Sequence, residues 1–177
     1  MTVLDEGVTV EVRPVTAVDD SVVRSLWQLY CYDFSRFLGS PLQPDGRFSE
    51  QPLGGLWTNA TRHAFLFTAD GNLAGFAIVD RLERSAVTAS TALWDMAQFF
   101  VVASARRRGT GTAAAAQVFD RFPGRWEVRA IAANVMAQQF WRVAISRYTG
   151  GRFAEVVLAN GPWHGTVQTF DTADRAS

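Results

Sequence analysis

The sequence predicts one α/β or α+β domain, and three observations support this prediction. Its 177 residues suit a single domain of ordinary size. Hydrophobic residues make up 48% of the chain and charged residues 19%, so the chain can bury a core and fold. Segments with strand-like alternation and segments with helical spacing follow one another, with no internal repeat and no low-complexity linker between them.

The first half of the chain predicts a strand, a helix, a loop and a hairpin. Valines alternate with polar residues before Pro14, and apolar residues recur at helical spacing after possible caps at 19–21. Asp70-Gly71-Asn72 is a tight-turn signal between two apolar runs. The predicted elements are a strand at 8–14, a helix from 19 to about 37, a loop or broken helices at 41–55, and strands at 63–68 and 73–80.

The second half predicts strands that alternate with helices. A long apolar run, rich in aromatic and β-branched residues, is typical of a central strand buried on both faces. An alanine-rich helical segment ends at Pro123-Gly124, and Asn134 is suited to cap a helix that Gly150 ends. After a surface connection at 83–91, the predicted strands are 92–102, 126–131, 153–158 and 166–170, the predicted helices are 112–122 and 135–149, and residues 172–177 are expected to fray.

Composition and charge exclude several functional classes. Seventeen basic residues balance seventeen acidic ones, which argues against a nucleic-acid binder. All the basic residues are arginine, and the lack of lysine excludes a Schiff-base mechanism and a Walker A loop, because both need an amine. Cys31 is the only cysteine, which excludes an internal disulfide and a multi-cysteine zinc site. With only two histidines, we expect no metal.

The apolar segments predict a cytoplasmic protein without membrane contact. Residues 1–14 show no basic start followed by an apolar run, so we expect no signal peptide. The most apolar stretch, 99–105, runs into three arginines and is much shorter than the ~20 residues that a membrane helix needs.

The most informative segment is the junction between the central strand and the alanine-rich helix, with the sequence RRRGTG at 106–111. Glycines at 109 and 111 let a ligand approach the backbone, and free amides at a helix start attract anions. The pattern therefore indicates a phosphate or pyrophosphate site. An ordinary glycine-rich turn explains the short motif equally well. A dinucleotide fingerprint would need a third glycine, and the arginine triplet also suits a solvated helix entry or, less well, a nucleic-acid patch.

The wider context resembles the GNAT acetyltransferase superfamily over about 95–145. The family's phosphate loop has Arg or Gln, two residues, Gly, one residue, and Gly or Ala, and the following strand ends at an Asn that opens a helix with an aromatic pair. The residues at these places are Arg106, Gly109, Gly111, Asn134, Ala137, Phe140 and Trp141.

This resemblance implies a single GNAT-type domain over 1–177 that binds acetyl-CoA. The implied fold is a central mixed, mostly antiparallel sheet of about six or seven strands, flanked by about four helices. The pantetheine arm would pair with the end of the central strand like an added strand, and the N–H of Val101 would polarise the thioester carbonyl and stabilise its oxyanion. The implied cofactor-binding residues are Phe100, Val101, Val102, Arg106, Arg107, Arg108, Gly109, Thr110, Gly111, Thr112, Asn134, Ala137, Phe140 and Trp141.

The resemblance is less specific about acid and base. Asp95 lies where some family members carry a glutamate base, six residues before Val101, but a strand-start carboxylate paired with an arginine is the alternative. Trp141 stands where the family often has a tyrosine that protonates the thiolate. Tyr148 is the candidate retained for that role, although it lies about two helical turns further on, ~10 Å away. Solvent, Tyr30 or Tyr32 are the alternatives.

The acceptor site is expected beside the first helix. Its aromatic residues suit either core packing or an acceptor pocket, and Asp33 or Asp45 would meet a cationic acceptor. Tyr30, Asp33 and Gln98 are the predicted substrate contacts. We expect an acetyl-CoA-dependent N-acyltransferase that acts by direct attack on the primary amine of a small molecule, as a monomer or homodimer. A protein amine stays open as acceptor, and a non-catalytic CoA-binding or sensor domain is the alternative function.

Overall fold

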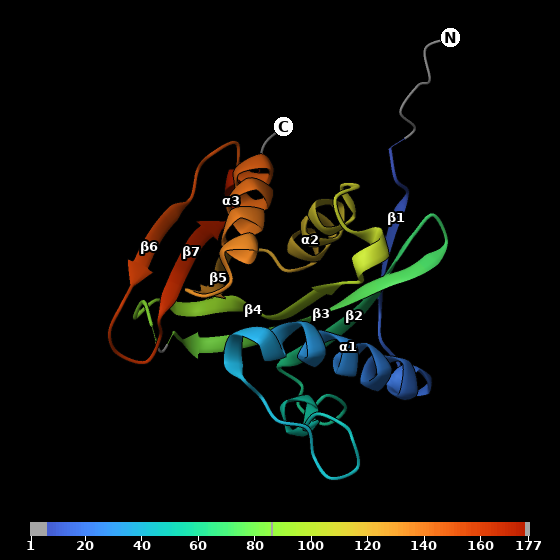
Figure 1. Ribbon diagram of the computed structural model, residues 1–177. Helices are drawn as coiled ribbons and strands as arrows, with labels where there is room; N and C mark the ends of the chain where they lie inside the picture. The colour runs from blue at the N-terminus through green and yellow to red at the C-terminus, as the bar shows by residue number, and fades with distance from the viewer. Residues whose placement is uncertain (1–6, 86, 176–177) are drawn as a thin grey trace.

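A computed structural model describes residues 7–85 and 87–175, and in it one seven-stranded sheet organises the chain (Figure 1). The strand order is β1-β2-β3-β4-β5-β7-β6. The strands are β1 (Val10–Pro14), β2 (Arg62–Ala69), β3 (Asn72–Arg84), β4 (Thr91–Val101), β5 (Arg125–Ile131), β6 (Ala154–Leu158) and β7 (Gly165–Asp171), and the helices are α1 (Asp20–Leu38), α2 (Thr110–Arg121) and α3 (Val135–Thr149).

The sheet is antiparallel except at its centre, where β4 and β5 run parallel. This pair is joined through α2, because a parallel connection needs a crossover. The two strands pair only at Trp94–Trp126 and Asp95–Glu127. Beyond these pairs they diverge, so the end of β4 toward Val101 has an unpaired edge that faces the space between the two halves of the sheet.

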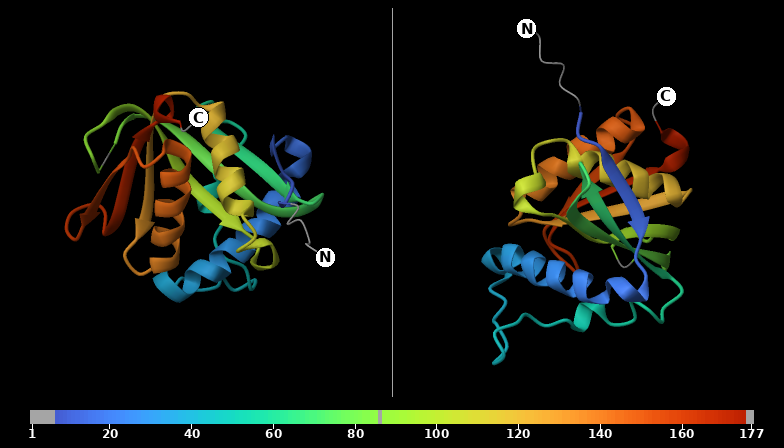
Figure 2. Two further views of the ribbon diagram at one scale, coloured as in Figure 1. Left: turned by 90° about the horizontal axis from the view of Figure 1, so that it is seen from above. Right: turned by 90° about the vertical axis from the view of Figure 1, so that its right-hand side faces the viewer.

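The helices cover both faces of the sheet: α1 lies on one face, and α2 and α3 lie on the other (Figures 1 and 2). On the first face, Val23, Leu26 and Trp27 of α1 pack into a core cluster with side chains of β2 and β3. On the second face, Ala114 and Ala115 of α2 are fully buried. Their small side chains let α2 approach the sheet closely.

The structure has three α-helices, one fewer than expected. The difference lies in 39–61, where the loop or broken helices predicted for 41–55 form only a short 3-10 turn at Gln51–Leu53. Proline lacks the amide that a helix interior needs, and the segment contains several prolines. Strand β3 also continues to Arg84, into the predicted surface connection.

The fraying expected for residues 172–177 stays a prediction, and the described part of this tail makes contacts within itself and with α2. Residues Thr172–Asp174 form a 3-10 turn, and Asp171 Oδ1 accepts a hydrogen bond from Ala173 N at 3.0 Å. Arg175 is paired with Asp120 at 3.1 Å. Residues 176–177 lie outside the described residues. So do residues 1–6, which are part of the N-terminal segment for which we expect no signal peptide. None of the helices in the described ranges has the length and apolar character needed to cross a membrane.

Candidate active site

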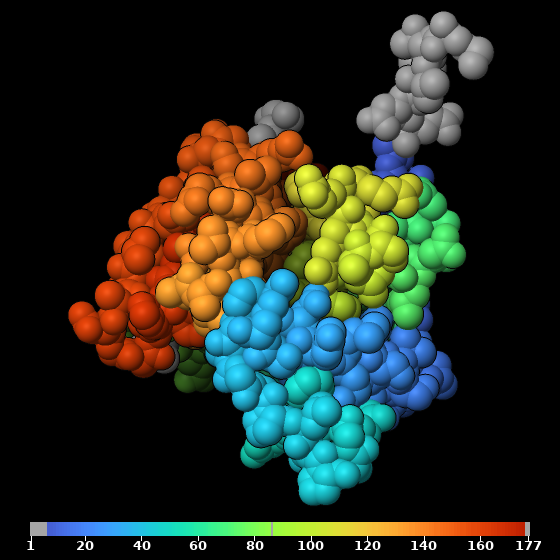
Figure 3. Space-filling model, viewed as in Figure 1, coloured from blue at the N-terminus to red at the C-terminus, as the bar shows by residue number. Residues whose placement is uncertain are grey.

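Two adjoining cavities lie where β4 and β5 diverge. The large cavity, about 880 Å³, is enclosed by α1, the loop after it, β4, β5 and α3. The small cavity, about 370 Å³, lies between α1, the end of β4, the RRRGTG loop and the start of α3. Figure 3 shows the hollow around which α1, α2 and α3 meet. Six residues line both cavities, which makes them neighbours: Tyr30, Phe34, Phe99, Asn134, Ala137 and Phe140.

The RRRGTG loop presents free backbone amides at the start of α2. Among the described residues, none of the amides from Arg107 to Thr112 has a hydrogen-bond partner. Gly109, the cap of α2, has φ +84°, and Arg107 has φ +63°. The Thr110 hydroxyl is also buried without a partner. Such a run of unpaired amides at a helix N-terminus is suited to bind an anion, as the sequence predicts.

The three arginines of this loop have different environments. Arg106 folds back, where its Nε donates to Val101 O at 2.7 Å and its Nη2 to Asp33. Arg108 is paired with Asp70 at 2.8 Å. Arg107 is exposed, and no carboxylate of the described chain lies within ion-pair distance of it. Arg107 is therefore the loop cation best placed for an external anion.

The position of Gly111 is fixed by packing as well as by the loop. A Cβ at Gly111 would lie 2.9 Å from Phe140 Cε2 and 3.3 Å from Val101 Cγ2. The Phe140 ring stacks on Phe99 with a centroid distance of 5.7 Å, so a shift of this ring away from residue 111 would disturb the stack.

Gly111→Ala is therefore expected to lower the free energy of unfolding by about 1–3 kcal/mol, the usual cost of overpacking. Urea unfolding would measure the loss. Gly7→Ala is the control without crowding, since a Cβ there meets nothing within 4 Å and Gly7, like Gly111, is not a positive-φ glycine. A Gly111→Ala protein as stable as the wild type would contradict the predicted crowding.

The free edge of β4 exposes backbone groups of alternate residues. Val102 N donates to Ala74 O at 2.8 Å, so Val102 forms a hydrogen-bonded pair with β3. In an antiparallel ladder the neighbouring residue, Val101 opposite Gly75, then points its amide away from β3. The sequence singled out Phe100, Val101 and Val102 as the pairing segment. The ladder assigns the free edge to Val101 and Phe99, because Phe100 and Val102 direct their amides to β3.

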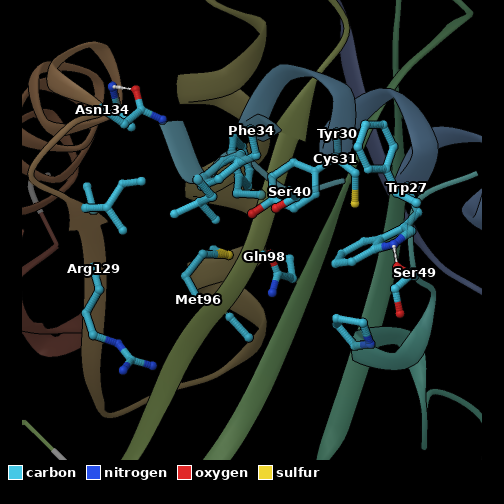
Figure 4. A pocket seen from close by; sticks show the side chains of 18 of the residues that line it. Trp27, Tyr30, Cys31, Phe34, Ser40, Ser49, Met96, Gln98, Arg129 and Asn134 are labelled. Carbon is cyan, nitrogen blue, oxygen red and sulfur yellow. Dashed lines mark hydrogen bonds between the residues drawn. The ribbon is translucent and has the colours of Figure 1, made fainter. Parts of the chain in front are cut away.

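Asn134 caps α3 and lines both cavities at the same time. Its Oδ1 accepts a hydrogen bond from Ala137 N at 3.0 Å (Figure 4). This bond leaves Nδ2 available to donate to a ligand. The two roles considered from the sequence, a helix cap and a ligand contact, are thus compatible in one side chain.

The large cavity has a wall of aromatic and apolar side chains. Trp27, Tyr30 and Phe34 of α1 lie on one side, and Met96 and Gln98 of β4 on the other (Figure 4). Trp27 packs on Tyr30, and Tyr30 on Phe34, with centroid distances of 5.2 and 4.7 Å. Trp141, where the family resemblance leads one to expect a tyrosine, is buried and also lines this cavity.

The loop after α1 closes this cavity and is tied to the helix. The Gln28 side chain accepts a hydrogen bond from Phe48 N at Oε1 (2.7 Å) and donates one from Nε2 to Phe48 O (3.1 Å). Trp27 Nε1 donates to Ser49 O at 2.9 Å. Glu50 is paired with Arg24 and Arg47, each at 2.5 Å. These contacts hold the loop as a preformed wall.

Asp95 lies beside the large cavity, in a buried group of charges. It is 4% exposed, and Arg129 Nη2 donates to its Oδ2 at 2.8 Å. Burial raises the pKa of Asp95 to about 6, partly opposed by Arg129 and supported by Glu127 and Asp80. Its Oδ1 has no hydrogen-bond partner in the described chain, nor has Oε1 of the fully buried Glu127, which lies 3.5 Å from Arg129 Nε. The ion pair considered as the alternative from the sequence is present, and Arg129, not Asp95, lines the cavity.

Three residues considered for the site from the sequence do not line the large cavity. Tyr148 lines neither cavity: its hydroxyl donates to Asp120 Oδ1 at 2.8 Å, and its ring packs on Phe119 and Phe170. Burial and Asp120 raise its pKa. Asp33 is bound to Arg106 and lines only the small cavity, so it does not meet an acceptor in the large one. Asp45 lines neither cavity.

Sequence reasoning missed Arg129, Trp163 and the loop from Ser40 to Pro52 as parts of the cavity wall. The Arg129 guanidinium lies over the Trp163 ring, 5.2 Å from its centroid. Strand Arg125–Ile131 alternates charged residues with apolar ones, and this alternation was the available signal that Arg129 shares a face of the sheet with Glu127. Within the described ranges, no three His, Cys, Asp or Glu side chains gather as a metal site requires.

The sequence matches the Acetyltransferase (GNAT) family over residues 23–144, well over half of the chain. The chain belongs to the GNAT acetyltransferase family. The match includes both the RRRGTG loop and Asn134. No curated protein matches the GNAT chain significantly.

Solved GNAT structures share the fold of this chain. An acetyltransferase from Thermus thermophilus has 19% identity and a TM-score of 0.63, covering 92% of this chain and 97% of its own. A GNAT acetyltransferase from Staphylococcus aureus has 11% identity and a TM-score of 0.61, and the match covers 93% of this chain and 99% of the S. aureus chain. Another from Desulfovibrio desulfuricans has 18% identity and a TM-score of 0.60, and the match covers 93% of this chain and 99% of the D. desulfuricans chain. At such identities the likeness establishes the GNAT fold.

Proposed function

We propose that the protein is an acetyl-CoA-dependent N-acetyltransferase that acylates the primary amine of a small molecule by direct attack in a ternary complex. The observation that carries the proposal is the meeting of the two cavities at the free edge of β4. One cavity opens on unpaired loop amides, and the other is a largely apolar chamber. An acetyl donor in one cavity and an amine acceptor in the other would lie side by side, which is the proximity that direct attack requires.

The residues present fit acetyl-CoA. The amides from Arg107 to Thr112 and the start of α2 suit its pyrophosphate. The free edge at Phe99 and Val101 suits an arm that carries amide groups, and Asn134 Nδ2 adds a donor. When bound, acetyl-CoA supplies an acetyl group activated as a thioester.

The chain's own residues then position groups and move one proton. Val101 N–H donates to the carbonyl oxygen under attack. Asp95, ionised above a pH of about 6, receives the proton of the amine through water at its unpartnered Oδ1. The Tyr30 hydroxyl donates a hydrogen bond to the leaving sulfur. In balance, one N–C bond forms and one C–S bond breaks. The acceptor enters as an ammonium and loses two protons: Asp95 takes one and passes it to solvent, and the departing thiolate takes up the other.

Arg107→Ala is expected to raise the dissociation constant for acetyl-CoA about tenfold, since it removes the free loop cation, and to weaken its salt dependence. Isothermal titration calorimetry at two salt concentrations measures both effects. Arg125→Ala is the matched control, because Arg125 is exposed and lines neither cavity. Equal loss of affinity in both variants would place the anion site elsewhere.

The proposed function is tested by transfer itself: release of CoA from acetyl-CoA, measured with a panel of primary amines. The replacement of a tyrosine by Trp141 favours the second candidate, a non-catalytic CoA-binding domain. Acetyl-CoA binding with amine-dependent CoA release supports the enzyme. Binding without transfer to any amine supports the sensor domain, and absence of binding overturns both.

A further inference from the structure

We propose that the large cavity selects a primary amine that carries one positive charge on a bulky apolar, preferably aromatic, body. It should discriminate against acceptors with a second amine and against acceptors with a carboxylate. This inference rests on the proposed function, because it names the acceptor of the same site. Three features of the cavity support it: the shape and chemistry of its wall, the pairing of the carboxylates around it, and the matched charge of Arg129.

The cavity wall offers apolar contact on every side. Trp27, Tyr30 and Phe34 pack on one another along α1 with tilted rings, Met96 faces them from β4, and Trp163 lies on the β5 side. At the mouth, Leu38 and Leu42 are 61% and 57% exposed. Both leucines line the cavity, so an apolar acceptor body would cover apolar surface that is now open to water.

No carboxylate of the described chain lines the cavity. The acids around it are paired with arginines: Asp33 with Arg106, Glu50 with Arg24 and Arg47, Asp80 with Arg62, and Asp95 and Glu127 with Arg129. The reacting amine gives up its charge to Asp95 in the proposed mechanism, but a second ammonium group on an acceptor would be desolvated without a counter-charge, which is costly. Diamines and other polycations should bind poorly.

Arg129 is the single charged side chain among the described residues that line the cavity, but its charge is already matched. Its Nη2 binds Asp95 at 2.8 Å, and its Nε lies 3.5 Å from Glu127 Oε1. A carboxylate on the acceptor would add a third negative charge to this group and be repelled. In the described chain Nη1 has no hydrogen-bond partner, so a neutral acceptor group such as an amide carbonyl can bind there.

The experiment compares kcat/KM for four amines at saturating acetyl-CoA: 2-phenylethylamine, phenylalaninamide, phenylalanine and 1,4-diaminobutane. The first two are expected to exceed the last two at least tenfold. Phenylalanine or 1,4-diaminobutane equal to or better than 2-phenylethylamine would overturn the inference while the N-acetyltransferase function stands.

A failed function and a failed inference give different results. If no amine is acetylated although acetyl-CoA binds, the same four amines are titrated calorimetrically into the protein saturated with CoA. Binding in the expected order supports the acceptor chemistry without catalysis. Absence of 2-phenylethylamine binding, or preference for the diamine, overturns it.

A charge introduced at the mouth tests the same argument from the protein's side. Leu42→Glu is expected to lower kcat/KM for 2-phenylethylamine at least fivefold and to raise it for 1,4-diaminobutane, because it adds the missing counter-charge. Leu29→Glu is the matched control, since Leu29 is an exposed leucine that lines neither cavity. The same change in both variants, or no change in Leu42→Glu, would contradict the inference.

Discussion

Tyr30→Phe is expected to lower kcat about 100-fold while the affinity for acetyl-CoA stays within twofold of the wild type. Loss of one well-placed hydrogen-bond donor at a developing negative charge typically costs 10²–10³ in kcat. Stopped-flow or steady-state assays of CoA release with 2-phenylethylamine would measure the loss.

The physical reason lies in the position of Tyr30 between the two cavities. It lines both of them, and its ring packs against Phe100, the neighbour of Val101, with a centroid distance of 5.9 Å. Burial raises the pKa of Tyr30, and the described residues offer its hydroxyl no partner. The hydroxyl therefore keeps its proton near neutral pH. It can donate a hydrogen bond to the leaving sulfur, in the role that Trp141 does not fill.

Tyr32→Phe is the matched control on the same helix, because Tyr32 is 71% exposed and lines neither cavity. It should leave kcat unchanged. An equal kcat for Tyr30→Phe and the wild type would remove Tyr30 from the mechanism, and a parallel loss of acetyl-CoA affinity would indicate a packing role instead.

Features carried by local sequence could be predicted. The helix bounds, the cap at Asn134 and the loop at 106–109 that leads into α2 follow from spacing and from residue types within a few positions. The ends of the helices agree within a few residues, since Gly39 and Gly150 provide the left-handed caps that stop α1 and α3.

Contacts between distant segments could not be predicted. The Arg106–Asp33 pair joins residues 73 positions apart, and the Arg129–Asp95 pair joins residues 34 apart. These pairings decide which carboxylates are free, and no local pattern encodes them. Tyr148 shares a helical face with Trp141, seven positions earlier, but Phe119 of α2 packs against both rings. Spacing alone does not reveal that the core covers this part of α3.

Asp95→Asn is expected to lower kcat/KM about 100-fold and at the same time to raise stability at pH 8. A general base contributes typically 10²–10⁴ in rate, and the loss should come with the disappearance of the group of pKa about 6 from the pH profile of kcat/KM. Asp80→Asn is the control for kcat/KM at pH 8, where Asp95 is ionised with or without it: Asp80 lies opposite Asp95 on β3, is bound to Arg62 at 2.8 Å, and lines neither cavity. Because Asp80 raises the pKa of Asp95, this variant should move the pH profile to lower pH without abolishing it.

The free energy of unfolding of Asp95→Asn is expected to rise at pH 8, although its kcat/KM falls, because burial raises the pKa of Asp95 from 3.8 to about 6 in the wild type. The folded state then holds the proton more tightly than the unfolded state. The stabilisation of the folded state by this bound proton is fully present below pH 3.8 and is lost as the pH rises through 6. In the wild type the loss is about 3 kcal/mol, mostly between pH 4 and pH 6.

Asparagine does not titrate, and its Oδ1 can still accept the hydrogen bond from Arg129. Urea unfolding between pH 4 and pH 8 should therefore show a flatter profile for Asp95→Asn, with a higher free energy of unfolding at pH 8. A variant that is more stable but about 100-fold slower cannot owe its slowness to misfolding, so the two measurements together separate the proton acceptor from the structural ion pair. Wild-type kcat/KM with an unchanged pH profile would leave Asp95 only the role of holding Arg129.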